Sequence, residues 1–305
     1  MTEILKMAKN FDDILKPFGE IDLLLFYGIV GEKLRKFLKN RELATKIWMP
    51  NDIYLIKRGT KLEPLFIDEF LESITLDFLE RRKKHLEEVR KELTPGQIKV
   101  WQYFFPRKLM DFFYATNSEK GKNIDRIFFD IDRGFGVSSE EAQQVTLEFV
   151  KVIKEDESIK DLISGEPFVS WTGSSFHVYL FLKKPKPPSF YEKNIQYLKS
   201  RPDEGLTSKW CKILNKKFNN VIPGHEKIKG KINIDPSQTP PGKLCRVPLG
   251  SLHMKDAKTI DGISIPLKVD MLEDEKLVGE LKNYSPKILL ESIDDLTKRL
   301  PKIFQ

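Results

Sequence analysis

Apolar residues in the first 95 positions recur every three or four residues, which is the spacing of an amphipathic helix. Two stripes show this spacing: Ile14, Phe18, Ile21 and Leu25, and then Ile67, Phe70, Leu71, Ile74 and Phe78. The charged run at 80–92 predicts a solvated helix face with i,i+4 ion pairs, and contact with nucleic acid is the less favoured alternative. Residues 1–96 are therefore predicted to be mainly helical, and Pro95-Gly96 predicts a break.

Beyond residue 97 the pattern changes to short apolar runs separated by helical stretches. The runs predict strands at residues 127–132, 168–171, 177–182 and 232–235, with extended segments near 244–249 and 262–269. Ser138 and Glu141 have the spacing of a capping box, which predicts that a helix begins there. Further helices are predicted at about 191–218 and at 286–305, the last ending near Pro301. This order predicts an α+β fold, with a mainly antiparallel sheet and helices on one face.

These patterns divide the chain into three predicted parts: a helical N-terminal region at 1–96, an α+β domain at 97–275 and a C-terminal helical tail at 276–305. Lys and Arg number 52 against 45 Asp and Glu, which gives a net charge of +7 and favours polyanionic partners such as nucleic acid. We find neither a leader nor an apolar run of the ~20 residues that span a bilayer. A cytoplasmic, nucleoid-associated protein without a membrane partner is expected. Cys211 and Cys245 lack a CxxC partner, so we predict no zinc site and no disulfide framework.

Two acids interrupt the apolar run at 127–132. On a strand, Asp130 and Asp132 project to the same side, about 7 Å apart at their Cα atoms, while Phe129 and Ile131 face the other side. Two carboxylates at this distance repel each other unless a cation lies between them, and a hard divalent ion is the usual partner. The alternative is a strand end where both acids meet solvent. The RGFG segment that follows, at 133–136, is predicted to be a turn.

A second polar cluster lies at 171–182, where two strand-like runs flank a Gly-Ser turn and so predict a hairpin. Ser175 and His177 then share one face of the return strand. A turn amide, a hydroxyl and an imidazole side by side suit a phosphate group. The alternative is a structural histidine.

A third cluster lies at 231–255. Asp235 ends an apolar strand and is a candidate for a further carboxylate at the same metal. Four donors follow it: Arg246, Ser251, His253 and Lys255. This mixture of cations and hydroxyls suits a triphosphate, and a basic surface loop is the alternative.

Taken together, the three clusters resemble the three motifs of the archaeo-eukaryotic primase superfamily, and most closely its archaeal and eukaryotic-type primase catalytic (small) subunit. The motifs are FFDID at 128–132, Ser-Phe-His at 175–177, and Asp235 followed by RVPLGSLHMK at 246–255. Their order and the interval from Asp235 to the GSLH stretch match that family. The lead-in at 112–132 is similar too, and the resemblance covers roughly residues 105–260.

The resemblance implies an RRM-like primase-polymerase domain and a nucleotidyl transferase that makes primers for replication. Asp130, Asp132 and Asp235 would hold two Mg²⁺ or Mn²⁺ ions as catalytic residues. The nucleotide-binding residues would be Ser175, His177, Arg246, Ser251, His253 and Lys255. The implied partners are single-stranded DNA template and primer, an NTP or dNTP, and a primase large or regulatory subunit or a helicase.

The chain departs from the family pattern at two points. The hairpin reads Thr-Gly-Ser-Ser-Phe-His, one residue shorter than the arginine-bearing, glycine-rich loop of the small subunit, and the cysteine-rich zinc module is missing. The family also includes primase-polymerases of plasmids and viruses and the polymerase domains of end-joining ligases. Gap filling at broken DNA ends, a non-catalytic nucleic-acid-binding subunit and a metal-dependent nuclease therefore stay open as alternatives.

Overall fold

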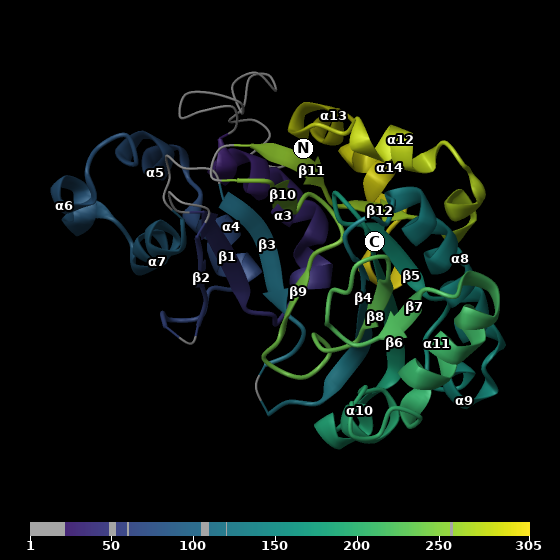
Figure 1. Ribbon diagram of the computed structural model, residues 1–305. Coiled ribbons are helices and arrows are strands. Elements are labelled where there is room, and N and C mark those ends of the chain that lie inside the picture. Colours follow the sequence, from purple (N-terminus) through teal and green to yellow (C-terminus); the bar gives the residue numbers. More distant parts are fainter. Residues whose placement is uncertain (1–21, 49–52, 60, 105–109, 120, 257–258) are drawn as a thin grey trace. The chain divides into compact units, whose positions relative to one another are not determined.

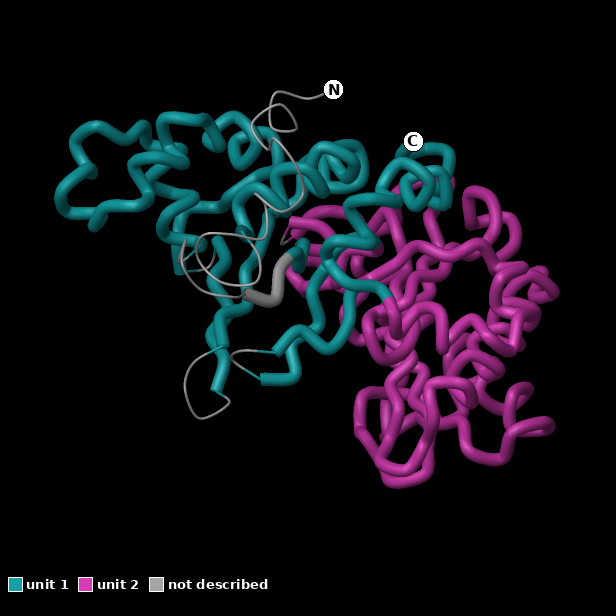
Figure 2. Tube along the Cα trace, turned by 90° about the horizontal axis from the view of Figure 1, so that it is seen from above, with its two compact units in different colours: residues 1–115, 249–263, 284–305 teal, residues 116–248, 264–283 magenta. Residues whose placement is uncertain are grey.

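The computed structural model describes residues 22–48, 53–59, 61–104, 110–119, 121–256 and 259–305 of the chain. Two compact units are present, and each is built from separate stretches of sequence (Figure 2). Unit 1 comprises residues 1–115, 249–263 and 284–305, and unit 2 comprises residues 116–248 and 264–283. The three-part division at residues 96 and 275 stays a prediction.

The N-terminal part of unit 1 combines helices with a small antiparallel sheet (Figure 1). The sheet has β1 (Leu43–Trp48) between β2 (Tyr54–Lys57) and β3 (Met110–Thr116). The helices are α3 (Leu23–Leu38), α4 (Ile67–Ser73), α5 (Leu76–Arg81), α6 (Leu86–Val89), η2 (Arg90–Glu92) and α7 (Pro95–Tyr103). Leu25 lies buried in α3, whereas Ile14, Phe18 and Ile21 lie outside the described residues. The described residues before 96 are thus mainly helical as predicted, and β1 and β2 are additions to the prediction.

Two local predictions in this region were wrong. The charged run at 80–92 does not form one helix, because α5 ends at Arg81 and only the short α6 and η2 follow. The Pro95-Gly96 pair is the start of α7 and not a break. Thr94 and Gln97 form a capping box there, and Pro95 occupies the first turn, where its missing N–H is tolerated.

The C-terminal parts of unit 1 are short elements. Strands β10 (Leu252–Met254) and β11 (Ile260–Ile263) pair as an antiparallel hairpin. The predicted single helix at 286–305 is instead α13 (Pro286–Glu291), α14 (Ile293–Thr297) and η4 (Lys302–Phe304). Ser292 interrupts it: its backbone leaves the helical conformation, and its hydroxyl donates to the Ile288 carbonyl.

Unit 2 is built on a six-stranded sheet (Figure 1). Its order is β12 (Ile265–Leu267), β5 (Phe168–Trp171), β6 (Phe176–Lys186), β4 (Ile124–Arg133), β8 (Ile232–Asp235) and β7 (Val221–Pro223). All neighbours pair antiparallel except β7 and β8. The short strand β9 (Leu244–Arg246) follows β8 in the chain. The predicted mainly antiparallel α+β architecture is confirmed.

Helices of unit 2 cover the apolar face of β4. Ser138 and Glu141 form the predicted capping box of α8 (Ser139–Glu155). The helix predicted at 191–218 is in fact two, α10 (Pro188–Asn194) and α11 (Gly205–Phe218), because the chain turns at 195–204 and Gly205 adopts a positive φ. The remaining helices are α9 (Glu157–Lys160), η3 (Val269–Glu273) and α12 (Leu277–Lys282).

Three rings join these helices to the sheet. Phe129 of β4 meets Phe149 of α8 and Trp210 of α11, with ring centroids 5.2 and 5.9 Å apart. Because side chains alternate along a strand, this contact puts Asp130 and Asp132 on the opposite face, as predicted. Among the described residues, no helix is both long and apolar enough to cross a membrane.

Asp156, between α8 and α9, gives unit 2 a predictable pH dependence. Burial alone would raise its pKa, but hydrogen bonds from Ser158, Lys209 and the Trp210 indole outweigh it and lower the pKa to about 2. A depressed carboxyl pKa stabilises the fold above the unfolded value of about 4, and this stabilisation is lost as the pH falls toward 2.

We therefore expect Asp156→Ala to lose about 2 kcal/mol of unfolding free energy near neutral pH, and less than about 0.5 kcal/mol of pH-dependent stability at pH 2. Urea unfolding of wild type and variant across this range measures the difference. Asp161→Ala, which removes an exposed carboxylate nearby, is the matched control. An Asp156→Ala deficit that stays constant with pH would contradict the expectation.

Candidate active site

Strand register aligns the acids predicted from the sequence. Asp130 of β4 lies directly opposite His177 of β6 on one side and Asp235 of β8 on the other. Directly opposed residues on neighbouring strands point to the same face of a sheet. His177, Asp130 and Asp235 therefore form one row across three strands. Asp132, two residues along β4, joins the same face.

Each carboxylate of this cluster has its own partner. His177 Nε2 lies 3.3 Å from Asp130 Oδ1, and Lys227 Nζ lies 2.9 Å from Asp132 Oδ1. Asp235 accepts hydrogen bonds of 2.9 Å from both the amide and the hydroxyl of Ser237. These contacts balance three acids within a small area, so the cluster depends on cationic and hydroxyl neighbours.

The pKa shifts report the repulsion among the three acids. Burial raises the pKa of Asp132 and of Asp235, and the charge of Asp130 raises both further. At Asp130 burial also raises the pKa, but the nearby His177, Lys227 and Arg246 outweigh it, so that the net pKa is lowered. A divalent cation among these oxygens would relieve the same repulsion.

The donor chemistry fits a hard divalent ion. Three carboxylates on one face of a sheet are the oxygen ligands that Mg²⁺ and Mn²⁺ prefer. His177 Nδ1 is buried and has no hydrogen-bond partner among the described residues, a cost that a bound polar ligand could remove. As the side chains stand, no three His, Cys, Asp or Glu residues in the described part of the chain converge closely enough to hold a metal.

The predicted hairpin is present between β5 and β6. Thr172 and Ser175 close its turn with two hydrogen bonds, and Gly173 has a φ of +104°, which favours glycine. The Ser175 hydroxyl donates to the Ile131 carbonyl and so joins the turn to β4. Both Ser175 and His177 are buried at this end of the sheet.

Arg246 also belongs to unit 2. It is buried, and its carbonyl accepts a hydrogen bond from the Tyr179 hydroxyl of β6. Since its charge contributes to lowering the pKa of Asp130, the guanidinium lies near the acids electrostatically. Unit 2 therefore brings together Ser175, His177 and Arg246 of the predicted phosphate-binding set.

The other three predicted nucleotide-binding residues lie in unit 1. Ser251 precedes β10 and is fully buried, and His253 on β10 is paired through Nδ1 with Asp261 of β11. Lys255 follows β10, where its amide donates to the Thr259 carbonyl. Their roles as nucleotide ligands stay predictions.

Sequence reasoning missed three residues that support the acids. Lys227 pairs with Asp132, and Ser237 orients Asp235. Asn233 donates to the carbonyls of Gly224 and Glu226 and so fixes the segment that carries Lys227. The Asp-Pro-Ser sequence at 235–237 is a turn signal that could have identified Ser237. No local pattern marks Lys227 or Asn233.

The RGFG segment after β4 is a turn into α8, as predicted, and it also packs against the loop before β8. The Gly134 amide donates to the Lys231 carbonyl, and the Gly230 amide donates to the Phe135 carbonyl. A Cβ atom on Gly134 would lie 1.8 Å from the Ile228 carbonyl oxygen, which no relaxation of a side chain can relieve. Only glycine allows this approach.

We therefore expect Gly134→Ala to displace residues 228–231 and to lower the unfolding free energy by at least about 2 kcal/mol. Chemical denaturation measures the loss. Gly279→Ala is the matched control: it lies in α12, and a Cβ atom added there would have no heavy atom within 4 Å, so the substitution should be neutral or stabilise the protein by up to about 1 kcal/mol. Equal effects of the two substitutions would contradict the packing argument.

Comparison with known proteins adds a structural likeness. No protein-family model matches the chain, and no curated protein sequence matches it. Among solved structures, the chain is similar to the polymerase domain of Mycobacterium tuberculosis Ligase D in complex with DNA, with a TM-score of 0.55 and 16% sequence identity over 92% of each chain. The fold is similar to that of a primase-polymerase domain. This confirms the predicted fold class, and the similarity is to the primase-polymerase branch and not to a particular primase subunit.

Proposed function

We propose that this chain is a template-directed nucleotidyl transferase of the primase-polymerase type. It joins NTPs or dNTPs to a 3′-hydroxyl on a single-stranded DNA template and so makes primers for replication. The observation that carries the proposal is the row of His177, Asp130 and Asp235 across three neighbouring strands, with Asp132 on the same face. The likeness to a polymerase domain supports the same chemistry.

Two Mg²⁺ or Mn²⁺ ions held by Asp130, Asp132 and Asp235 would activate the attacking hydroxyl and neutralise the triphosphate. Ser237 keeps the Asp235 carboxylate in a fixed orientation, and Asn233 holds the segment behind it. The burial of these groups within the sheet limits their movement, which is what a metal-dependent site requires of its ligands.

The chain's own donors would bind the nucleotide. His177 and Arg246 lie in unit 2 near the acids, where an imidazole and a guanidinium can donate to phosphate oxygens. Ser251, His253 and Lys255 are proposed as further phosphate ligands from unit 1. The net charge of +7 favours binding of a DNA template, which is a polyanion. A large or regulatory primase subunit or a helicase is the proposed protein partner.

Gap filling at broken DNA ends is the second candidate function. It shares the metal site and the transfer reaction, and the specific observation that favours it is the likeness to the polymerase domain of a DNA ligase. A non-catalytic subunit is less well supported, because all three acids are present on one sheet face.

One comparison of substrates tests these functions. The purified chain, supplied with Mn²⁺ and labelled NTPs or dNTPs, is offered unprimed single-stranded DNA and, separately, gapped duplexes with a 5′-phosphate. Products on the unprimed strand would support primer synthesis, and products confined to the gapped duplex would support gap filling. Degradation of labelled DNA without any nucleoside triphosphate would identify a nuclease and overturn both.

A further inference from the structure

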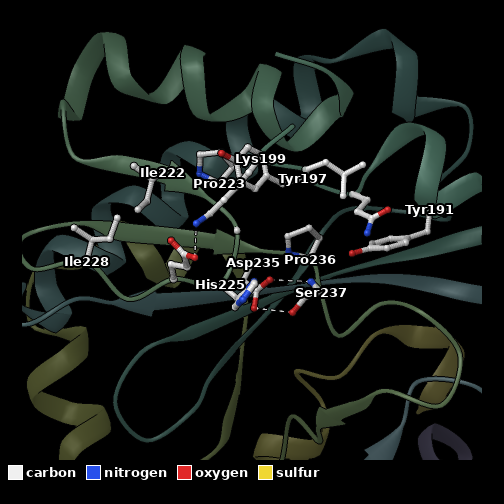
Figure 3. Close-up of a pocket in the computed structure, with 14 residues that line it drawn as sticks. Tyr191, Tyr197, Lys199, Ile222, Pro223, His225, Ile228, Asp235, Pro236 and Ser237 are labelled. Carbon is white, nitrogen blue, oxygen red and sulfur yellow. Dashed lines mark hydrogen bonds and ion pairs between the residues drawn. The ribbon is translucent and has the colours of Figure 1, made fainter. Parts of the chain in front are cut away.

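Unit 2 contains a cavity of about 750 Å³ that reaches the candidate active site. Its wall is formed by α10 and the segment after it, which contribute Tyr191 and Tyr197, and by β7 and the segment after it, which contribute Ile222 and His225 (Figure 3). Asp235 also lines it. The volume lies within the roughly 300–1,000 Å³ of small-molecule sites. One of the three candidate metal ligands therefore faces a space large enough for a nucleotide.

The lining suits a base and a sugar better than a triphosphate. Aromatic rings and the aliphatic side chains of Ile222 and Ile228 form much of the wall. The cation Lys199 is ion-paired with Glu226, another lining residue, and Asp235 adds a negative charge. A triphosphate needs several cationic donors, whereas nucleobases stack on aromatic side chains irrespective of sequence.

A buried tyrosine hydroxyl faces this cavity without a partner. Tyr191 is 4% exposed, and no described residue makes a hydrogen bond with its hydroxyl. Burial and the charge of Asp235 both raise the pKa of Tyr191, so the hydroxyl stays a donor. Figure 3 shows the hydroxyl directed toward Pro236 and Ser237. A buried polar group without a partner costs free energy, which a ligand that accepts its hydrogen bond would remove.

Tyr197 offers a supported aromatic surface. Its ring packs against Gly224, where an added Cβ atom would lie 2.8 Å from the ring Cδ1 atom. Asn233 holds the Gly224 carbonyl from below, so the backbone under this ring is fixed. A ring backed by rigid backbone loses little conformational freedom when a base stacks on it.

The position of the cavity in the sheet relates it to the reaction. Ser175 and His177 lie on the β6 side of Asp130, whereas the cavity lies on the β8 and β7 side, next to Asp235. In phosphoryl transfer the attacking and leaving oxygens are roughly in line on opposite sides of phosphorus. Phosphate-binding groups on one side of the acids leave the other side for the attacking strand.

We propose that this cavity binds the 3′-terminal nucleotide of the growing strand, with its base on Tyr197 and its 3′-hydroxyl next to Asp235. This inference rests on the proposed nucleotidyl transferase function. In that reaction the 3′-oxygen forms a bond to the α-phosphorus, the bond from that phosphorus to pyrophosphate breaks, and the hydroxyl proton passes to water.

A fluorescent base tests the binding step without catalysis. Oligonucleotides carry 2-aminopurine either at the 3′ end or at an internal position, and fluorescence is measured with the chain in EDTA. Stacking on an aromatic ring is expected to quench the 3′-terminal probe and not the internal one. Tyr197→Ala should abolish this quenching, and Ile228→Trp, which fills the cavity from an exposed position, should do the same without removing a packed ring.

Primer extension tests the same site during synthesis. Both variants should raise the KM for the primer strand about tenfold and leave the KM for the incoming nucleotide unchanged. Tyr284→Ala, which removes a half-buried tyrosine of unit 1, and Ile213→Trp, at an exposed position of α11, are matched controls that should leave both KM values as in wild type.

Three results would overturn the inference: equal quenching at the two probe positions, unchanged primer KM in both variants, or a rise confined to the nucleotide KM, which would assign the cavity to the incoming nucleotide. Failure of the proposed function is separate, because it appears as no synthesis by the wild-type chain. The quenching measurement still decides the occupant of the cavity in that case.

Discussion

Replacing Asp130 and Asp132 together by alanine is expected to lower nucleotide incorporation at least ~1,000-fold, because the transferred charge then has no metal to stabilise it. The loss corresponds to about 4 kcal/mol of transition-state free energy, within the several kcal/mol that metal ions contribute to such reactions. Initial rates with Mn²⁺ and a labelled nucleotide measure it. Thermal unfolding of the same variant reports whether the fold is kept.

The matched control lies on the same strand. Asp125 of β4 is 45% exposed, and its partner is Arg126, 3.3 Å away. Asp125→Asn should keep the wild-type rate, since this acid precedes the cluster by five positions. A folded Asp130→Ala, Asp132→Ala variant that still incorporates nucleotides would show that the acids are not the metal ligands.

The second large effect is expected on stability. In unit 1, the Asp22 carboxylate and the Arg82 guanidinium form a two-pronged pair that is almost fully buried, with one contact of 2.7 Å. Asp22 also caps α3 by accepting from the Leu25 amide. Removing one member of a buried pair leaves the other charge uncompensated. Asp22→Ala should therefore cost about 3–5 kcal/mol of unfolding free energy.

Urea denaturation measures this loss, and Asp68→Ala is its control. Asp68 pairs with Arg35 at 2.6 Å, but both side chains are about half exposed, so solvent screens the interaction. A change of at most about 1 kcal/mol is expected. Equal losses for Asp22→Ala and Asp68→Ala would mean that burial does not set the strength of the first pair.

Local patterns predicted the elements whose signals are short in range. The strand bounds at 168–171 and 232–235 and the capping box of α8 were correct, because apolar alternation and a Ser-x-x-Glu spacing each act over a few residues. The helices at 191–218 and 286–305 were predicted too long. Their interruptions at Gly205 and Ser292 depend on backbone conformations that apolar spacing does not record.

The candidate site shows the same division. The sequence by itself determined the three acids and the shared side of Asp130 and Asp132, because a strand has a fixed period of two. Only the tertiary structure decided that His177, Asp130 and Asp235 stand in one row, since register depends on pairing among residues far apart in the chain. It also decided that Lys227 and Ser237 support the acids and that a cavity opens beside Asp235. Such contacts arise from packing between distant segments, and no local sequence pattern encodes them.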